Sequence, residues 1–262
     1  MKTQFPRYEV FLEFAEKLAD VSGEMLLAAA NKVPEIDVKA DASFVTQTDK
    51  AVEKAMREMI AQAFPDHGIL GEEFENINLD AEYVWVLDPI DGTAPFIAGI
   101  PVYGTLIGLA WKGKPFVGVI NHPATSDRWV GVAGLFAKRN GQPASVKACT
   151  QLSKAFVTCS SPDFMTEEEL ARFSKLRKVV PYVQYGGSCF AYGTLASGRT
   201  DLAVDSDLAP YDVYASAAVI QGAGGHMTDW DGNQITLEWS GKVIAAGDRD
   251  CLEAAITILK AD

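Results

Sequence analysis

Two carboxylates follow directly on a short apolar segment in the first half of the chain. Residues 84–87 are apolar, Asp88 and Asp91 come next, and Gly92 and Thr93 complete the segment. Acids at the end of a buried strand lower stability unless a cation or solvent compensates them, and oxygen ligands without histidine or cysteine suit Mg²⁺. A glycine and a hydroxyl beside free backbone N–H groups can hold a phosphate. The alternative is an ordinary turn, because Asp-Pro and Asp-Gly pairs favour turns.

Further acids elsewhere in the chain could complete such a site. Glu72 and Glu73 follow a second short apolar run, although a solvated acidic loop is the simpler explanation of these two alone. Asp49 and Asp212 each open an apolar stretch with helical spacing, where a carboxylate is favourable at the positive end of the helix dipole. Capping is therefore the simplest role of both, but a capping carboxylate can also bind a metal.

The sequence does not support a serine hydrolase, a zinc site or a structural Ca²⁺ site. The three histidines, His67, His122 and His226, have no partner at triad or zinc spacing, so we interpret them as structural or surface residues. The serines lack the glycine-flanked turn of a serine hydrolase nucleophile. A structural Ca²⁺ module is excluded by the absence of its characteristic loop.

The periodicity predicts helices over residues 8–31 and 49–64, followed by a largely antiparallel sheet. Its strands are expected at residues 84–88, 103–111, 115–121 and 128–133. After a polar stretch at 141–153 the pattern alternates between strands (155–159, 181–185, 201–205, 242–246) and helices (from Thr166, 188–197, 212–222, 249–260). Such alternation predicts an α/β unit. We therefore expect an N-terminal α+β subdomain, residues 1–145, with most of the ligands, and a C-terminal α/β subdomain, residues 146–262.

The composition narrows the classes of partner. The 262 residues carry a formal net charge of −12, which argues against a nucleic-acid surface because backbone phosphates are neutralised by clustered Lys and Arg. An anionic substrate would need bound cations that reverse the sign of the site. No apolar stretch is long enough to span a bilayer, and residues 1–7 do not resemble a signal peptide. Four scattered cysteines indicate free thiols in the cytoplasm.

Taken together, the segments resemble a known family. Gly-Glu-Glu at 71–73, Trp-Val-Leu-Asp-Pro-Ile-Asp-Gly-Thr at 85–93 and Tyr-Asp at 211–212, followed by Gly-Ala-Gly-Gly at 222–225, resemble the inositol monophosphatase superfamily over nearly the whole chain. Gly-Gly-Ser-Cys at 186–189 and the segment from Gly99 to Ile107 are similar to its histidinol-phosphatase branch.

The resemblance implies a fold and a set of roles. The fold would be the layered αβαβα sandwich of the inositol monophosphatase and fructose-1,6-bisphosphatase type, usually a homodimer. The implied Mg²⁺ ligands are Glu72, Asp88, the backbone carbonyl of Ile90, Asp91 and Asp212. Asp49 would lie nearby as a further carboxylate. Thr93 with Glu72 would orient the attacking water, and the amides of Gly92 and Thr93 would meet the phosphate.

The implied function is a Mg²⁺-dependent phosphomonoesterase of histidine biosynthesis acting on histidinol phosphate. Asp205, seven residues before Asp212, falls where the family places an acid that contacts the alcohol part of the substrate. Together with Asp207 it could recognise the cationic groups of histidinol. Ser188 lies in the same pocket, where the branch usually has an aspartate. The alternatives are inositol 1-phosphate or a range of sugar phosphates as substrate, and a non-catalytic regulator that binds protein or RNA on the same fold.

Overall fold

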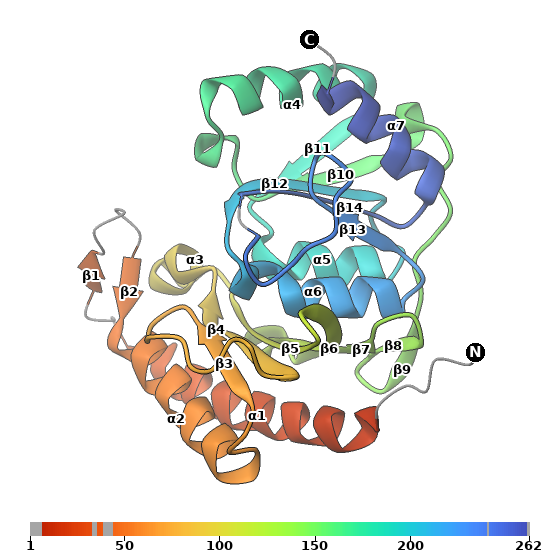
Figure 1. The fold of residues 1–262 in the computed structure, drawn as a ribbon. Helices are drawn as coiled ribbons and strands as arrows, with labels where there is room; N and C mark the ends of the chain where they lie inside the picture. The colour runs from red at the N-terminus through yellow and green to blue at the C-terminus, as the bar shows by residue number, and fades with distance from the viewer. Residues whose placement is uncertain (1–6, 33–35, 39–43, 240, 261–262) are drawn as a thin grey trace.

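The two large β-sheets form separate layers of the molecule, with helices between them and on their outer faces (Figure 1). The computed structural model describes residues 7–32, 36–38, 44–239 and 241–260. Residues 1–6, from which we expected no signal peptide, lie outside the described residues.

The first sheet has seven strands and comes from the N-terminal half. In spatial order they are β3 (Gly68–Gly71), β4 (Tyr83–Asp91), β5 (Gly104–Trp111), β6 (Lys114–His122), β7 (Asp127–Val132), β8 (Phe136–Arg139) and β9 (Gln142–Ala144). β3 pairs with β4 in parallel, and every later pair in this sheet is antiparallel. The predicted, largely antiparallel sheet is therefore confirmed.

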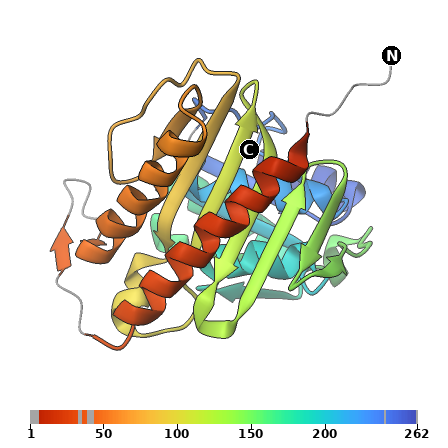
Figure 2. The same cartoon turned by 90° about the horizontal axis from the view of Figure 1, so that it is seen from below.

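Two long helices cover the outer face of this sheet. α1 (Tyr8–Ala29) and α2 (Gln47–Ala63) lie side by side over it, roughly along the direction of its strands (Figure 2). Their apolar faces bury Leu18 and Met56 with Trp85 of β4 in one hydrophobic cluster. Burying such side chains stabilises a fold by about 1.5–3 kcal/mol each. A short hairpin, β1 (Ile36–Val38) with β2 (Phe44–Thr46), leads into α2.

Helices from the C-terminal half form the middle layer. α5 (Ser188–Ala196) and α6 (Pro210–Gly222) lie between the two sheets, and α6 packs on β5, β6 and β7. The approach is close, because a Cβ at Gly118 of β6 would overlap the carbonyl oxygen of Ala215. Residues 213–220 of α6 are all buried and almost all apolar, as expected of a helix enclosed on every side.

The second sheet has five strands, in the order β11 (Tyr182–Tyr185), β10 (Phe156–Cys159), β12 (Leu202–Leu208), β14 (Gly241–Ala246) and β13 (His226–Thr228). α4 (Glu167–Val179) and α7 (Arg249–Lys260) pack together on its outer side (Figure 1). Thr166 caps α4 with the predicted capping box. The layers are thus α1 and α2, sheet, α5 and α6, sheet, α4 and α7, which confirms the αβαβα sandwich.

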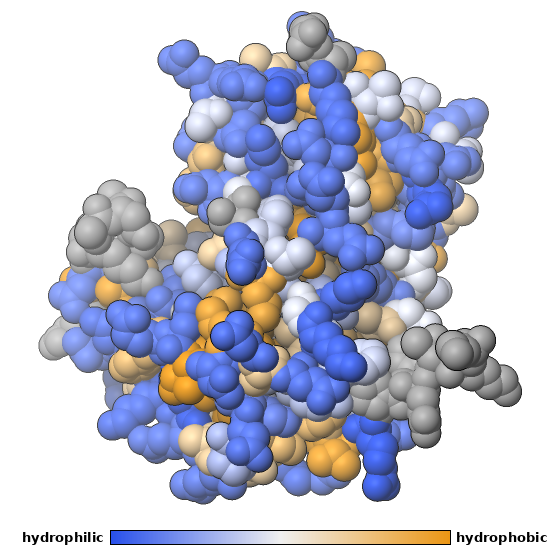
Figure 3. Space-filling view, viewed as in Figure 1, coloured by the Kyte–Doolittle hydropathy of each residue, from blue (hydrophilic) through white to orange (hydrophobic). Residues whose placement is uncertain are grey.

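Short elements connect these layers: α3 (Thr93–Ala98) and the 3₁₀ turns Pro123–Thr125, Leu152–Lys154 and Pro162–Phe164. The last strand of the first sheet ends at residue 144, and the first strand of the second sheet begins at residue 156. A division into two subdomains at residue 145 stays a prediction. No helix in the described ranges has the length and hydrophobicity to span a bilayer. The face in Figure 3 is predominantly hydrophilic, with apolar atoms grouped near its middle.

Candidate metal centre

The last residues of β4 depart from a regular strand, and this departure brings two carboxylates together. The sequence predicts that the strand ends at Asp88, but β4 continues through Pro89 to Asp91. Its register shifts there, since Asp88 faces Leu106 and Asp91 faces Gly104, which inserts one extra residue into β4. Residues three apart on a regular strand point to opposite faces. The bulge removes this difference and turns both acids toward one site.

A third carboxylate reaches the same place from α6. Asp212 lies in the first turn of α6, where its Oδ2 accepts a hydrogen bond of 2.6 Å from the Ala209 N–H. The helix begins at Pro210, two residues earlier than predicted, so Asp212 caps the helix from its third position. Asp88, Asp91 and Asp212 each offer an oxygen within 4.8 Å of the others, an arrangement that could hold a metal ion.

The electrostatics of the cluster favour a cation. Burial raises the pKa of Asp88 well above its usual range, and the negative charges of Glu72, Asp91, Asp212 and Asp49 raise it further. Burial also raises the pKa of Asp212 well above normal, with Asp91, Glu72 and Asp205 adding repulsion. Within the described part of the chain, Asp88 Oδ1 is buried and accepts no hydrogen bond. A buried acceptor of this kind costs free energy unless it binds a donor or a cation. The donor set therefore fits a hard divalent metal.

Glu72 lies beside this cluster because of the way β3 and β4 pair. The two strands run in parallel, so their carboxyl ends meet at one edge of the sheet. Glu72 directly follows β3 and is half-buried. Its charge is the strongest of those that raise the pKa of Asp88. The structure thus brings Glu72 close to the aspartates. This proximity favours a role in the site over the alternative that Glu72 belongs only to a solvated acidic loop.

Asp49 contacts Thr93 from the start of α2. Thr93 Oγ1 lies 3.4 Å from Asp49 Oδ1 and donates at 3.1 Å to the carbonyl oxygen of Ile90. Asp49 Oδ2 accepts the N–H of Thr46 at 2.8 Å and also its hydroxyl. Thr46 is therefore the N-cap residue of α2, three positions before Asp49. Asp49 is the third residue of the capping box, and its other oxygen faces the site.

Gly92 and the start of α5 form the opposite wall. Gly92 has φ +82°, a conformation that favours glycine, and a Cβ there would lie 2.8 Å from the hydroxyl of Ser188. The N–H of Cys189 donates to Asp91 Oδ2 at 2.6 Å, and both this bond and the thiol hold the pKa of Asp91 lower than its burial alone would. The N-terminus of α5 thus stabilises the carboxylate form of Asp91.

A buried histidine lies behind this wall. His122 Nε2 is 3.1 Å from the thiol sulfur of Cys189, and burial lowers the pKa of His122 to about 4. His122 is therefore a neutral core residue, which agrees with its interpretation as structural.

Asp205 is a buried acid of the neighbouring sheet. It lies on β12, is 3% exposed, and accepts hydrogen bonds of 2.6 Å from the Ser160 N–H and from the Tyr192 hydroxyl. Burial raises the pKa of Asp205, whereas these donors lower it. Its charge also raises the pKa of Asp91 and Asp212, which places Asp205 beside the carboxylate cluster.

Three contributions to the site were not predicted from the sequence. Thr46, Tyr192 and the Cys189 N–H act through hydrogen bonds to Asp49, Asp205 and Asp91 that span up to 98 positions. Only the capping-box spacing of Thr46 and Asp49 could have been found from the sequence.

The chain is similar to known proteins over nearly its whole length. The sequence model of the Inositol monophosphatase family matches residues 7–261. The chain is 43% identical over 259 residues to the bifunctional phosphatase IMPL2, chloroplastic, of Arabidopsis thaliana, covering 95% of this chain and 75% of that protein. It is 33% identical to a histidinol-phosphatase of Chlorobaculum parvum, covering 89% and 91%. The structure of an inositol monophosphatase from Zymomonas mobilis matches with a TM-score of 0.90 at 38% identity, covering 98% and 100%.

Proposed function

Since the chain belongs to the inositol monophosphatase family and is therefore a phosphatase, we propose that it hydrolyses L-histidinol phosphate with the help of Mg²⁺. The observation that carries the proposal is the group of three carboxylates, Asp88, Asp91 and Asp212, whose oxygens lie within 4.8 Å of one another. The buried, unbonded Oδ1 of Asp88 adds to it.

Mg²⁺ bound here would be held by Glu72, Asp88, Asp91, Asp212 and the Ile90 carbonyl. It would supply positive charge against the phosphoryl oxygens, where charge is concentrated during phosphoryl transfer. The Ile90 carbonyl accepts the Thr93 hydroxyl, and because a carbonyl oxygen has two lone pairs, this bond would not prevent it from also binding a metal.

Thr93 and Glu72 would orient the attacking water. Because the Thr93 hydroxyl proton is directed to Ile90 or Asp49, its oxygen keeps lone pairs that can accept a hydrogen from the water. As the water oxygen bonds to phosphorus and the ester P–O bond breaks, the water proton can pass to Thr93 Oγ1, whose own proton moves to Asp49 Oδ1. The alcohol oxygen that leaves takes up a proton from solvent, and Asp49 returns its proton to solvent after the phosphate has left. The Gly92 and Thr93 amides would face the phosphate.

Asp205 supports histidinol phosphate as the substrate. Its position beside Asp91 adds a negative charge next to the reacting groups, which favours an alcohol that carries an ammonium and an imidazole. Similarity to a histidinol-phosphatase agrees with this substrate. Inositol 1-phosphate is the second candidate, because Ser188 removes an acid from the pocket and the Zymomonas mobilis structure of an inositol monophosphatase matches over 98% of this chain.

Phosphate release from the two substrates, measured side by side with Mg²⁺, tests the proposal. We expect kcat/KM for L-histidinol phosphate to exceed that for inositol 1-phosphate. In Asp205→Asn we expect this preference to fall by about 10-fold, since a charged hydrogen bond is worth roughly 1.5–3 kcal/mol and a neutral one less. Asp250→Asn is the control, because Asp250 is exposed in the first turn of α7, away from the carboxylate cluster. Equal or reversed preference in the unmodified chain would identify inositol 1-phosphate or a broader class as the substrate.

A further inference from the structure

α2 carries three charged residues at intervals of one helical turn. Asp49, Glu53 and Arg57 are spaced i, i+4 and i+8, so they lie along one face of the helix. Asp49 and Glu53 are fully buried, and the Arg57 side chain is 11% exposed. Asp49 contacts Thr93 at one end of this face. The other two residues contact the loop that follows β3.

Glu53 and Arg57 form a buried ion pair that binds this loop through its backbone. Arg57 Nε donates to Glu53 Oε1 at 2.7 Å, and Glu53 Oε2 accepts the N–H of Glu73 at 2.8 Å. The two terminal nitrogens of Arg57 donate to the carbonyl oxygens of Phe74 and Glu75, each at 3.0 Å. The guanidinium also lies 5.7 Å from the centre of the Phe74 ring.

These contacts replace the sheet pairing that the loop lacks. β3 ends at Gly71, and residues 72–76 belong to no strand. Three consecutive residues, 73 to 75, are instead held by one side-chain pair of α2. The approach leaves no space for a side chain at Gly71, because a Cβ there would overlap Glu53 Oε1. Glu72 lies between the two fixed points, Gly71 and Glu73.

We propose that Glu53 and Arg57 are positioning residues for Glu72, and that the pair sets the affinity of the site for its divalent cation. The inference rests on the proposed function in that it takes Glu72 as a metal ligand. Groups that orient ligands in this way commonly change metal affinity or activity by about 10- to 100-fold when altered. α2 would then align Asp49 with Thr93 and Glu72 with the aspartates as one rigid element.

Arg57→Lys is the most informative variant. Lysine keeps the positive charge beside Glu53, so no buried carboxylate is left unpaired. Its single ammonium cannot reproduce the planar fork that joins Glu53 to two carbonyl oxygens at once. The loop would lose its fixed position, while the core around α2 stays intact.

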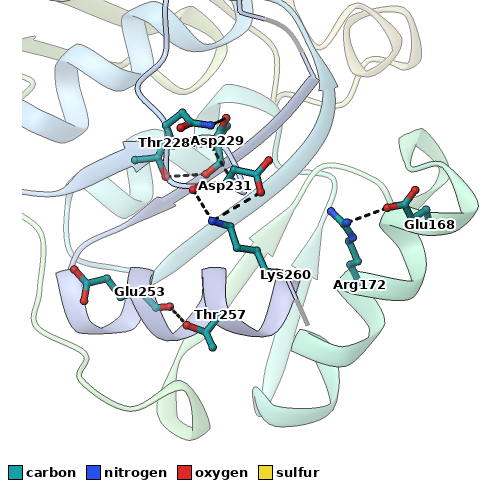
Figure 4. A network of polar contacts seen from close by, with 9 residues as sticks. Glu168, Arg172, Thr228, Asp229, Asp231, Glu253, Thr257 and Lys260 are labelled. Carbon is teal, nitrogen blue, oxygen red and sulfur yellow. Dashed lines mark hydrogen bonds and ion pairs between the residues drawn. The ribbon is translucent and has the colours of Figure 1, made fainter. Parts of the chain in front are cut away.

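Arg172→Lys is the matched control. Arg172 of α4 pairs with Glu168 at 2.9 Å, also one helical turn away, in the outer layer of the molecule (Figure 4). The control thus repeats the same substitution in a pair with the same i, i+4 spacing, but at a more exposed position away from the metal centre. Thermal melting in the absence of metal would report the structural cost of each variant.

The test is calorimetric titration with Mg²⁺ alone, joined to phosphate release as a function of Mg²⁺ concentration. We expect Arg57→Lys to raise the Kd for Mg²⁺ and the half-saturating Mg²⁺ concentration by about 10-fold or more, as altered orienting groups do, with kcat at saturating Mg²⁺ nearly retained. Arg172→Lys should leave both unchanged. An unchanged Kd in Arg57→Lys would overturn the inference, and so would an equal increase in the control.

The two claims can fail separately. An unmodified chain that binds Mg²⁺ but releases no phosphate would refute the proposed function, and the calorimetric comparison would still decide the role of Arg57. A chain that binds no Mg²⁺ would overturn both. If Arg57→Lys does not fold, Glu53→Gln takes its place: its amide oxygen still accepts the Glu73 N–H, whereas its hold on Arg57 is weakened, and the same criterion applies.

Discussion

Replacing Asp91 by asparagine is expected to lower kcat by at least ~100-fold at saturating Mg²⁺, the size seen when one electrostatic contact to a transition state is lost. Asp91 offers an oxygen to the carboxylate cluster and is fixed by the Cys189 N–H at 2.6 Å. Asparagine keeps the size of the side chain but removes its charge, so the effect isolates electrostatics from packing. Steady-state phosphate release is the measurement.

Asp250→Asn serves as the control for this experiment. Asp250 is an exposed residue in the first turn of α7, in the outer layer, and its replacement should leave kcat unchanged. Near-normal activity of Asp91→Asn with saturating Mg²⁺ would refute the assignment of Asp91 as a metal ligand.

Mg²⁺ is expected to raise the melting temperature of the chain, and Asp88→Asn is expected to abolish that rise. Mg²⁺ at 100 times its Kd stabilises a folded protein by about 2.7 kcal/mol, and each 1 kcal/mol raises the Tm of a chain of this size by roughly 2–4 °C. Without metal, Asp88→Asn should melt higher than the unmodified chain, because it removes a buried charge that four other acids repel. Differential scanning calorimetry with and without Mg²⁺ checks both effects.

The raised pKa of Asp88 predicts that the melting temperature depends on pH in opposite directions with and without metal. The pKa of Asp88 is higher in the folded than in the unfolded state, so binding of a proton to Asp88 favours the folded state. This stabilisation is complete below the unfolded-state pKa of about 3.9 and is lost as the pH rises through the folded-state pKa. Without metal, the Tm should therefore rise as the pH falls from 7 toward 5. With Mg²⁺ it should fall, since protons compete with the cation. A Tm that follows the same trend in both conditions would contradict this account.

The local patterns of the sequence were sufficient to predict most helices and strands and to single out the acids that the structure groups, whereas the order of the layers followed from the family resemblance. The helical spacing in α1 and α2, the alternation after residue 155 and the capping box at Thr166 are local patterns, and each is confirmed. The grouping of Asp88, Asp91 and Asp212 agrees with the predicted metal ligands, because acids beside apolar segments are conspicuous in a sequence.

The remainder depends on contacts between distant segments. The bulge that aligns Asp88 with Asp91 requires the pairing of β4 with β5, so a predicted strand end at Asp88 missed it. Glu53 and Arg57 occupy ordinary positions of an amphipathic helix, and only the fold brings them to residues 73–75. In the same way, the hydroxyl of Tyr192 in α5 donates a hydrogen bond to Asp205 of β12. Hydrogen bonds of this kind leave no periodic trace in the chain.

The carboxylate cluster is expected to bind the cation on which hydrolysis depends. A crystal structure of the chain grown with Mn²⁺ in place of Mg²⁺ would locate that cation, because the anomalous scattering of Mn²⁺ identifies its position. We expect anomalous density between Asp88, Asp91 and Asp212, with Glu72 and the Ile90 carbonyl also in contact, and none in an Asp88→Asn crystal grown in the same way. Density elsewhere, with this cluster empty, would contradict the account.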